Sequence, residues 1–121
     1  MKKENRKYIL VRTDGTYSIV EISDCDFLSQ AYKLIECRLI ETVPIMGNEI
    51  FIADQEGRLK DKPRLNCFAS CLYQQLHGGD FIVGNVLIGC YEKSDIYGLT
   101  SDVINKYVKV LEECEYENKC T

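Results

Sequence analysis

Four basic residues are spaced two apart along a polar stretch in the middle of the chain. They are Arg58, Lys60, Lys62 and Arg64. The stretch leads to Asn66, which can cap a helix that begins at the next residue. Arginine can hold a phosphate or carboxylate with two parallel hydrogen bonds, and the free amides of a helix start favour the same groups. We therefore expect Arg58, Arg64 and Asn66 to bind an anionic ligand. A solvated loop is the simpler alternative.

Tyrosine is the main aromatic residue of the chain, which has eight tyrosines, four phenylalanines and no tryptophan. Tyr91 and Tyr97 lie around the last predicted loop. A half-exposed tyrosine combines an apolar ring with a polar tip, which suits interfaces and flat ligands such as nucleobases. We expect Tyr91 and Tyr97 to contribute to ligand binding, with ordinary sheet-edge positions as the alternative.

The single histidine, His77, argues against nucleophilic catalysis. A serine or cysteine hydrolase needs a nucleophile, a base and a group that orients the base. His77 precedes two glycines at a predicted helix end, where the helix dipole favours an exposed histidine. The sequence contains neither a phosphate-binding P-loop motif nor a dinucleotide fingerprint. We expect no enzyme activity, although an acid–base pair such as Glu41 with Tyr91 stays open.

The seven cysteines include no Cys-x-x-Cys pair. Structural zinc sites normally use close pairs of ligands, so we expect no metal site, and we expect no cofactor. An odd number of cysteines fits reduced thiols packed mostly as small apolar groups. Cys67 and Cys71, four residues apart on a predicted helix, should share a core-facing side.

Length and composition predict one ordinary globular domain over residues 1–121. A chain of 121 residues is within the size of a single domain, roughly 100–200 residues, and 45% of it is apolar. No apolar run is long enough for a membrane span or a signal core, so we expect a cytoplasmic protein. The formal net charge of −4 makes nucleic acid an unfavoured partner. The charged tail over residues 113–121 should fray.

Two hairpins and a helix are predicted in the first half. The Asp14-Gly15 pair favours a tight turn, so residues 8–22 should form a hairpin. Residues 39–53 should form another, with Pro44 at a strand end or on a sheet edge. Apolar residues at three-to-four spacing predict a helix over residues 26–36.

The second half predicts a helix over residues 67–76, a largely buried strand over residues 81–91 and a helix over residues 101–113. A bulge or a turn should interrupt the strand at Gly84-Asn85. The order predicts an α+β fold: a two-layer sandwich of a mainly antiparallel sheet with about three helices on one face. Apolar strands could leave a sheet edge open, so we expect a homodimer.

Short segments in the order of the chain carry a family resemblance. They are residues 40–43, 52–59, 63–66, 80–86 and 98–100, which read IETV, IADQEGRL, PRLN, DFIVGNV and GLT. In this order they resemble a family of small uncharacterised proteins of phages and mobile elements of low-GC Gram-positive bacteria. The likeness covers roughly residues 38–110, and Gln55 stands where an acidic residue is common in the family. The family is a domain of unknown function, so the resemblance implies a setting and no catalytic residue.

Small acidic phage proteins that lack catalytic groups often act by binding, and this resemblance therefore implies a binding role. The first expectation is capture of an anionic, nucleotide-derived immune signal. The alternative is a protein-interaction module that inhibits a host factor. Nucleic-acid mimicry is weaker because −4 is a small charge. A pocket lined by Arg58, Arg64 and Asn66 with an aromatic wall would favour the first role, and a flat apolar patch would favour the second.

Overall fold

The computed structural model describes residues 6–60, 62–78 and 81–120, with only the backbone described for Asp24 and residues 114–120. The described elements, in chain order, are β1 (Lys7–Val11), β2 (Tyr17–Glu21), the 3-10 turn η2 (Asp24–Asp26), α1 (Phe27–Ile35), β3 (Ile40–Met46), β4 (Glu49–Asp54), the 3-10 turn η3 (Gly57–Leu59), α2 (Cys67–Leu76), β5 (Val86–Glu92), β6 (Asp95–Tyr97) and α3 (Ser101–Cys120). The predicted hairpins and helices are all present, and the α+β class is confirmed.

The strands form one antiparallel sheet in the order β2-β1-β5-β4-β3, with β6 paired to the far end of β5. β5 is therefore the central strand. β2 and β3 are the outer strands of this five-strand order, and β6 pairs only with β5. Pro44 lies on the edge strand β3, where its missing N–H is tolerated, and this prediction is confirmed.

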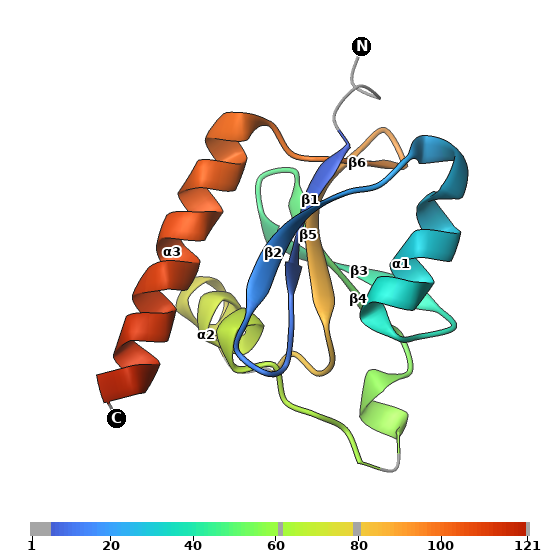
Figure 1. The fold of residues 1–121 in the computed structure, drawn as a ribbon. Coiled ribbons are helices and arrows are strands. Elements are labelled where there is room, and N and C mark those ends of the chain that lie inside the picture. Colours follow the sequence, from blue (N-terminus) through green and yellow to red (C-terminus); the bar gives the residue numbers. More distant parts are fainter. Residues whose placement is uncertain (1–5, 61, 79–80, 121) are drawn as a thin grey trace.

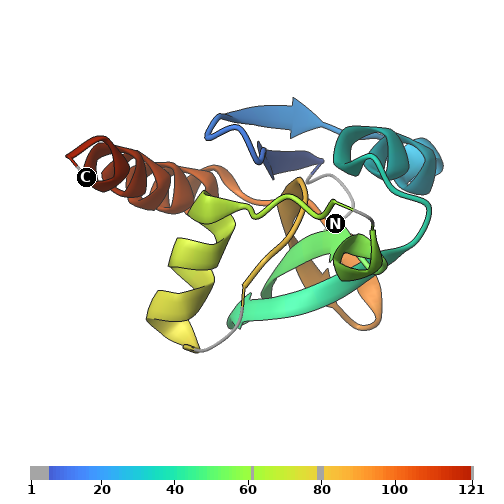
Figure 2. The same ribbon diagram turned by 90° about the horizontal axis from the view of Figure 1, so that it is seen from below.

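Helices cover both faces of the sheet, so the expectation that they lie on one face is wrong. Figures 1 and 2 show α1 on one side of the strands, and α2 and α3 on the other. On β1, Ile9 and Val11 join the core under α2 and α3, whereas Tyr8 and Leu10 join the core under α1. A central strand that is apolar on both faces needs a helix on each of them.

The predicted strand over residues 81–91 begins only at Val86. Gly84 has a φ of +82°, a conformation that glycine adopts without strain, and it turns the chain before β5. The turn alternative at Gly84-Asn85 is thus the correct one. Phe81 lies outside the strand and is 53% exposed, so the expectation of burial is wrong for this part of the segment.

The helix starts follow the sequence signals. Asn66 caps α2, since its side-chain oxygen accepts from the Ala69 amide at 3.0 Å. Thr100 accepts from the Val103 amide at 3.4 Å at the start of α3. α3 extends to Cys120, beyond the expected end at residue 113. Fraying of the tail stays a prediction.

The described cysteines are less buried than expected. Cys67 is exposed, as is Cys25, and the expectation that Cys67 faces the core is wrong. Cys71 is half-buried and packs against the core under α2 and α3. The physical reason is that α2 turns Phe68, Ala69 and Leu72 toward the sheet, which leaves its first residue in solvent.

Candidate functional site

A hollow of about 440 Å³ lies between the β1–β2 turn, the end of α1 and the loop after η3. Its basic lining residues are Arg12, Lys60, Lys62 and Arg64. We call this hollow, lined by these four residues with Asp14, Glu36 and Asn85, the basin. In Figure 1 the chain segments that surround it are at the lower end of the sheet. The basic loop predicted from the sequence is therefore part of a concave surface.

Asn85 joins three of the segments around the basin. Its side-chain oxygen accepts from the Thr13 amide at 3.0 Å, and its amide group donates to Leu34 O at 3.3 Å. The antiparallel register of β1 and β5 pairs Val11 with Val86, which places Arg12 beside Asn85. Residues far apart in sequence are thereby held at one end of the sheet.

Lys60 forms a salt bridge with the buried carboxylate of Asp54 at the side of the basin. Its ammonium lies 2.8 Å from a carboxylate oxygen of Asp54 and donates to Glu36 O at 3.0 Å. The other oxygen of Asp54 accepts from the Glu56 amide at 2.9 Å. The hydrogen bond with Asp54 raises the pKa of Lys60 above its ordinary value. The positive charge of Lys60 is thus largely balanced within the protein.

The charges of the other three basic side chains of the basin are not neutralised by a salt bridge within the described residues. Arg12 donates to two hydroxyl oxygens, those of Thr16 at 3.2 Å and Ser18 at 2.8 Å. Lys62 and Arg64 are exposed. Within the described residues, none of Arg12, Lys62 and Arg64 forms a salt bridge. These three positive charges are therefore available to an anion.

The acidic residues of the basin partly offset this charge. Hydrogen bonds from Thr16 lower the pKa of Asp14, and the nearby charge of Arg12 lowers it further. Glu36, the C-cap residue that follows α1, is exposed. An anion would therefore bind best on the side of Lys62 and Arg64, away from Asp14.

A second hollow, of about 510 Å³, adjoins the basin and shares Glu36, Asp54 and Lys60 with it. It adds the half-buried ring of Tyr32 and the thiol of Cys37. Burial raises the pKa of Cys37, and the negative charge of Asp54 raises it further. The aromatic residue of this adjoining hollow, Tyr32, is on α1.

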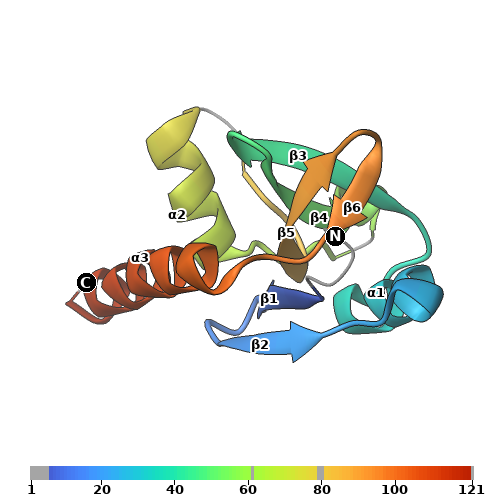
Figure 3. The same ribbon diagram turned by 90° about the horizontal axis from the view of Figure 1, so that it is seen from above.

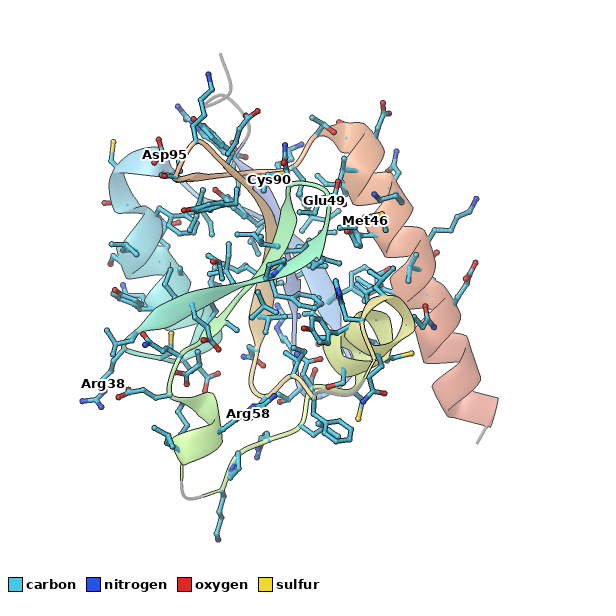
Figure 4. All side chains as sticks on the ribbon, turned by 180° about the vertical axis from the view of Figure 1, so that it is seen from behind. Arg38, Met46, Glu49, Arg58, Cys90 and Asp95 are labelled. Atoms are coloured by element: carbon cyan, nitrogen blue, oxygen red, sulfur yellow. The ribbon has the colours of Figure 1, made fainter. Side chains whose placement is uncertain are left out.

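Of the predicted ligand residues, the structure brings only Arg64 into the basin. Arg58 donates to Phe81 O and lines a different hollow with Glu41 and Tyr73. Figure 4 shows Arg58 at the lower end of the molecule. Arg58 and Arg64 flank the same loop but do not line one pocket.

Asn66 supports the basin from beneath. It is fully buried, and its amide group donates to Val11 O at 3.0 Å and to Gly84 O at 2.9 Å. Gly84 lines the basin, whereas Asn66 does not. Asn66 therefore positions the basin wall and caps α2 at the same time.

Tyr91 and Tyr97 lie at the opposite end of the sheet, in the β5–β6 hairpin, as Figure 1 shows. In Figure 4, Asp95 marks this hairpin, far from Arg58. Tyr91 is 42% exposed and Tyr97 is half-buried. The structure therefore does not bring the two tyrosines to the basic loop. Glu41 and Tyr91 are also apart, because Glu41 pairs with Ala53, whereas the Tyr91 amide bonds to Asn48 at the hairpin turn.

His77 has a structural partner. One of its ring nitrogens donates to Ile45 O at 2.7 Å, and its ring packs on Tyr73 with centroids 4.8 Å apart. It therefore ties the end of α2 to β3. Within the described residues, no three His, Cys, Asp or Glu side chains could hold a metal ion. No helix in the described part of the chain is long and apolar enough to cross a membrane.

Sequence reasoning missed Arg12, Tyr32 and Asn85. Arg12 is the last residue of the first predicted strand, and Asn85 lies at the predicted interruption of another, so neither position indicated a binding role. Their meeting depends on the pairing of β1 with β5, for which the sequence carries no local signal. Tyr32 lies within the helical repeat of α1, where an aromatic residue is usually part of the core.

Comparison with known proteins identifies the family. The sequence pattern described as a domain of unknown function (DUF3846) matches residues 6–112, from the start of the sheet into α3. Neither the curated proteins nor the solved structures include a match to the chain. The match covers most of the sequence, and the protein therefore belongs to the DUF3846 family of domains of unknown function.

Proposed function

We propose that this protein is a cytoplasmic, non-catalytic binding protein that sequesters an anionic, nucleotide-derived small molecule in the basin. The observation that carries the proposal is the convergence of Arg12, Lys62 and Arg64 on one hollow, without a salt bridge among the described residues. Guanidinium and ammonium groups from separate segments can surround a phosphate on several sides.

The dimensions of the site suit a ligand of nucleotide size. The basin has about 440 Å³, within the range of about 300–1,000 Å³ that is usual for small-molecule sites. A phosphate at Lys62 and Arg64 would leave the rest of the ligand free to extend past Lys60 toward Tyr32. Tyr32 would then take the stacking role that we expected of Tyr91 and Tyr97.

The setting implied by the resemblance to phage and mobile-element proteins supports an immune signalling nucleotide as the ligand. A phage protein gains by removing such a signal from solution, and sequestration needs tight binding without turnover. The absence of a positioned histidine base is consistent with this role, because His77 is held by Ile45 O.

A thermal-shift screen with cyclic dinucleotides and ADP-ribose tests the proposal. A ligand that binds only the folded state adds about 2.7 kcal/mol of stability at 100 times its dissociation constant. We expect a rise in melting temperature with at least one nucleotide, and its loss in the double variant Lys62→Ala/Arg64→Ala. Lys109→Ala is the matched control, because Lys109 is an exposed lysine on α3. No shift with any nucleotide, or a shift that the double variant retains, would contradict the proposal.

An apolar hollow beside α2 favours a second candidate function, which is the binding of a host protein. Leu65 and Phe81 are about half exposed and line a hollow of about 390 Å³ with Cys67 and Cys71 on α2. Apolar surface of this kind is common where another protein binds. A module that blocks a host factor would lose its partner in a pull-down when Phe81→Ser is introduced, and would keep it in Lys62→Ala/Arg64→Ala. The opposite pattern would exclude this alternative.

A further inference from the structure

The outer strands β2 and β3 differ in whether another strand could hydrogen-bond to their outward backbone groups. At β2, the Arg12 amide donates to Thr16 O and the Ile22 amide donates to Arg6 O. Hydrogen-bonded pairs alternate along an antiparallel ladder, so the backbone groups of Tyr17, Ile19 and Glu21 point away from β1. They form the outer row of the edge.

The outer row of β3 is protected against pairing. The Gln55 amide donates to Leu39 O, so Leu39 and Gln55 form a hydrogen-bonded pair. By the same alternation, the backbone groups of Ile40, Thr42 and Pro44 point away from β4. Pro44 has no N–H to donate, and the register shifts between Pro44 and Met46. Prolines and bulges on an edge strand prevent the addition of another strand.

β2 has neither of these protections. It contains no proline, its register with β1 is regular, and Ile19 is 49% exposed. Figures 2 and 3 show β2 at the margin of the molecule, with no described element beyond it. A regular edge strand with an exposed apolar residue at its centre is a site for strand addition.

We propose that β2 pairs with β2 of a second copy of this chain, antiparallel and centred on Ile19. In this register the outward backbone groups of Ile19 bond to those of the partner's Ile19. Tyr17 and Glu21 lie opposite the partner's Glu21 and the partner's Tyr17. The two sheets become one continuous sheet across a two-fold axis.

The side chains of β2 are complementary to their own copy in this register. The exposed Ile19 packs against the partner's Ile19 on the face that carries α3. Each Glu21 lies opposite the partner's Tyr17, an uncharged residue, so no two like-charged residues of the strand are directly opposed. The Tyr17 hydroxyl itself donates to Glu112 of its own chain at 3.3 Å. On the other face, Ser18 lies opposite the partner's Val20. A second copy therefore provides hydrogen-bond partners for the outward backbone groups of Ile19 and Glu21.

The experiment measures mass by light scattering after size exclusion at micromolar concentration. The wild type should have twice the chain mass of 13.9 kDa. Ile19→Lys and Ile19→Glu should each be monomeric, because each sets two like charges against each other at the two-fold axis. An equimolar mixture of the two variants should recover the dimer. Thr42→Lys, at an outward position of β3, is the matched control and should stay dimeric.

A monomeric wild type, or a dimer that Ile19→Lys leaves intact, would overturn the proposal. Amide hydrogen exchange of the wild type gives an independent result that needs no folded variant. The Ile19 and Glu21 amides should exchange slowly in the dimer, because they are bonded across the axis. Fast exchange at both amides would also overturn it.

Discussion

The side chain of Asn66 donates to the backbone carbonyl of Val11 at 3.0 Å and thereby joins the start of α2 to the end of β1. The same amide group donates to Gly84 O, and the side-chain oxygen caps α2. One buried side chain thus holds three segments together: the start of α2, the end of β1 and the turn before β5.

Asn66→Ala should destabilise the protein by about 3 kcal/mol or more, since it removes a helix cap and leaves buried carbonyls unpaired. Urea unfolding measures this change in the free energy of unfolding. Asn48→Ala, at an exposed position in the β3–β4 turn, is the control and should change it by less than about 0.5 kcal/mol. Equal effects of the two substitutions would show that the Asn66 contacts contribute little.

The Tyr107 hydroxyl donates to Glu49 at 2.6 Å, and Lys106 lies 3.0 Å from the same oxygen. Figure 4 shows Glu49 beside Cys90, near α3. Burial raises the pKa of Tyr107 above its ordinary value of 10.0, and the hydrogen bond to Glu49 raises it further. Above pH 10 the unfolded chain therefore loses this proton while the folded chain keeps it, and stability falls as pH rises.

Tyr107→Phe tests this coupling. It should cost about 1.5–3 kcal/mol at neutral pH, as is typical for a lost hydrogen bond to a charged group. It should also flatten the decline in stability above pH 10, because phenylalanine does not ionise. Chemical unfolding between pH 7 and pH 11, compared with the wild type, measures both effects. Parallel profiles for the two proteins would contradict the assignment of the alkaline decline to Tyr107.

Gly89 allows Tyr8 to pack directly on β5. A Cβ atom at residue 89 would lie 2.9 Å from the Tyr8 ring and 3.1 Å from Tyr97 O. Gly89→Ala should therefore destabilise the protein by about 1–3 kcal/mol through overpacking. Gly57→Ala is the control, since its nearest contacts would be ordinary ones at 3.6 Å. Thermal unfolding compares them, and an equally mild effect at Gly89 would refute the packing argument.

The thiols should differ in reactivity. Cys37 is half-buried, and its raised pKa lowers the fraction of reactive thiolate. Cys67 is exposed. At neutral pH, iodoacetamide should label Cys67 several-fold faster than Cys37, as followed by peptide mass spectrometry. Faster labelling of Cys37 would mean that its surroundings are more open or more electropositive than the structure indicates.

Local signals predicted most of the fold. The Asp14-Gly15 turn predicted the first hairpin, and Asn66 predicted the start of α2, because turns and caps are decided by neighbouring residues. The placement of helices on both faces follows from pairing that joins distant segments. The apolar run of β5 did indicate helices on both faces, because a strand that is buried on both faces lacks the alternation of apolar and polar residues.

The candidate site was less predictable than the fold. The basic loop was visible in the sequence, but its partner Arg12 is brought to it only by the alignment of β1 with β5. Arg58 faces the other side of η3 because it bonds to Phe81 O. Side chains on an irregular loop have no periodicity from which their direction could be inferred.

Amide chemical-shift mapping with ADP-ribose tests whether the basin binds a nucleotide-type anion. We expect saturable shifts at Thr13, Arg64 and Asn85, which weaken as salt is added and are absent in Lys62→Ala/Arg64→Ala. Shifts confined to Tyr91 and Tyr97, or no saturable shift with ADP-ribose or any cyclic dinucleotide, would contradict it.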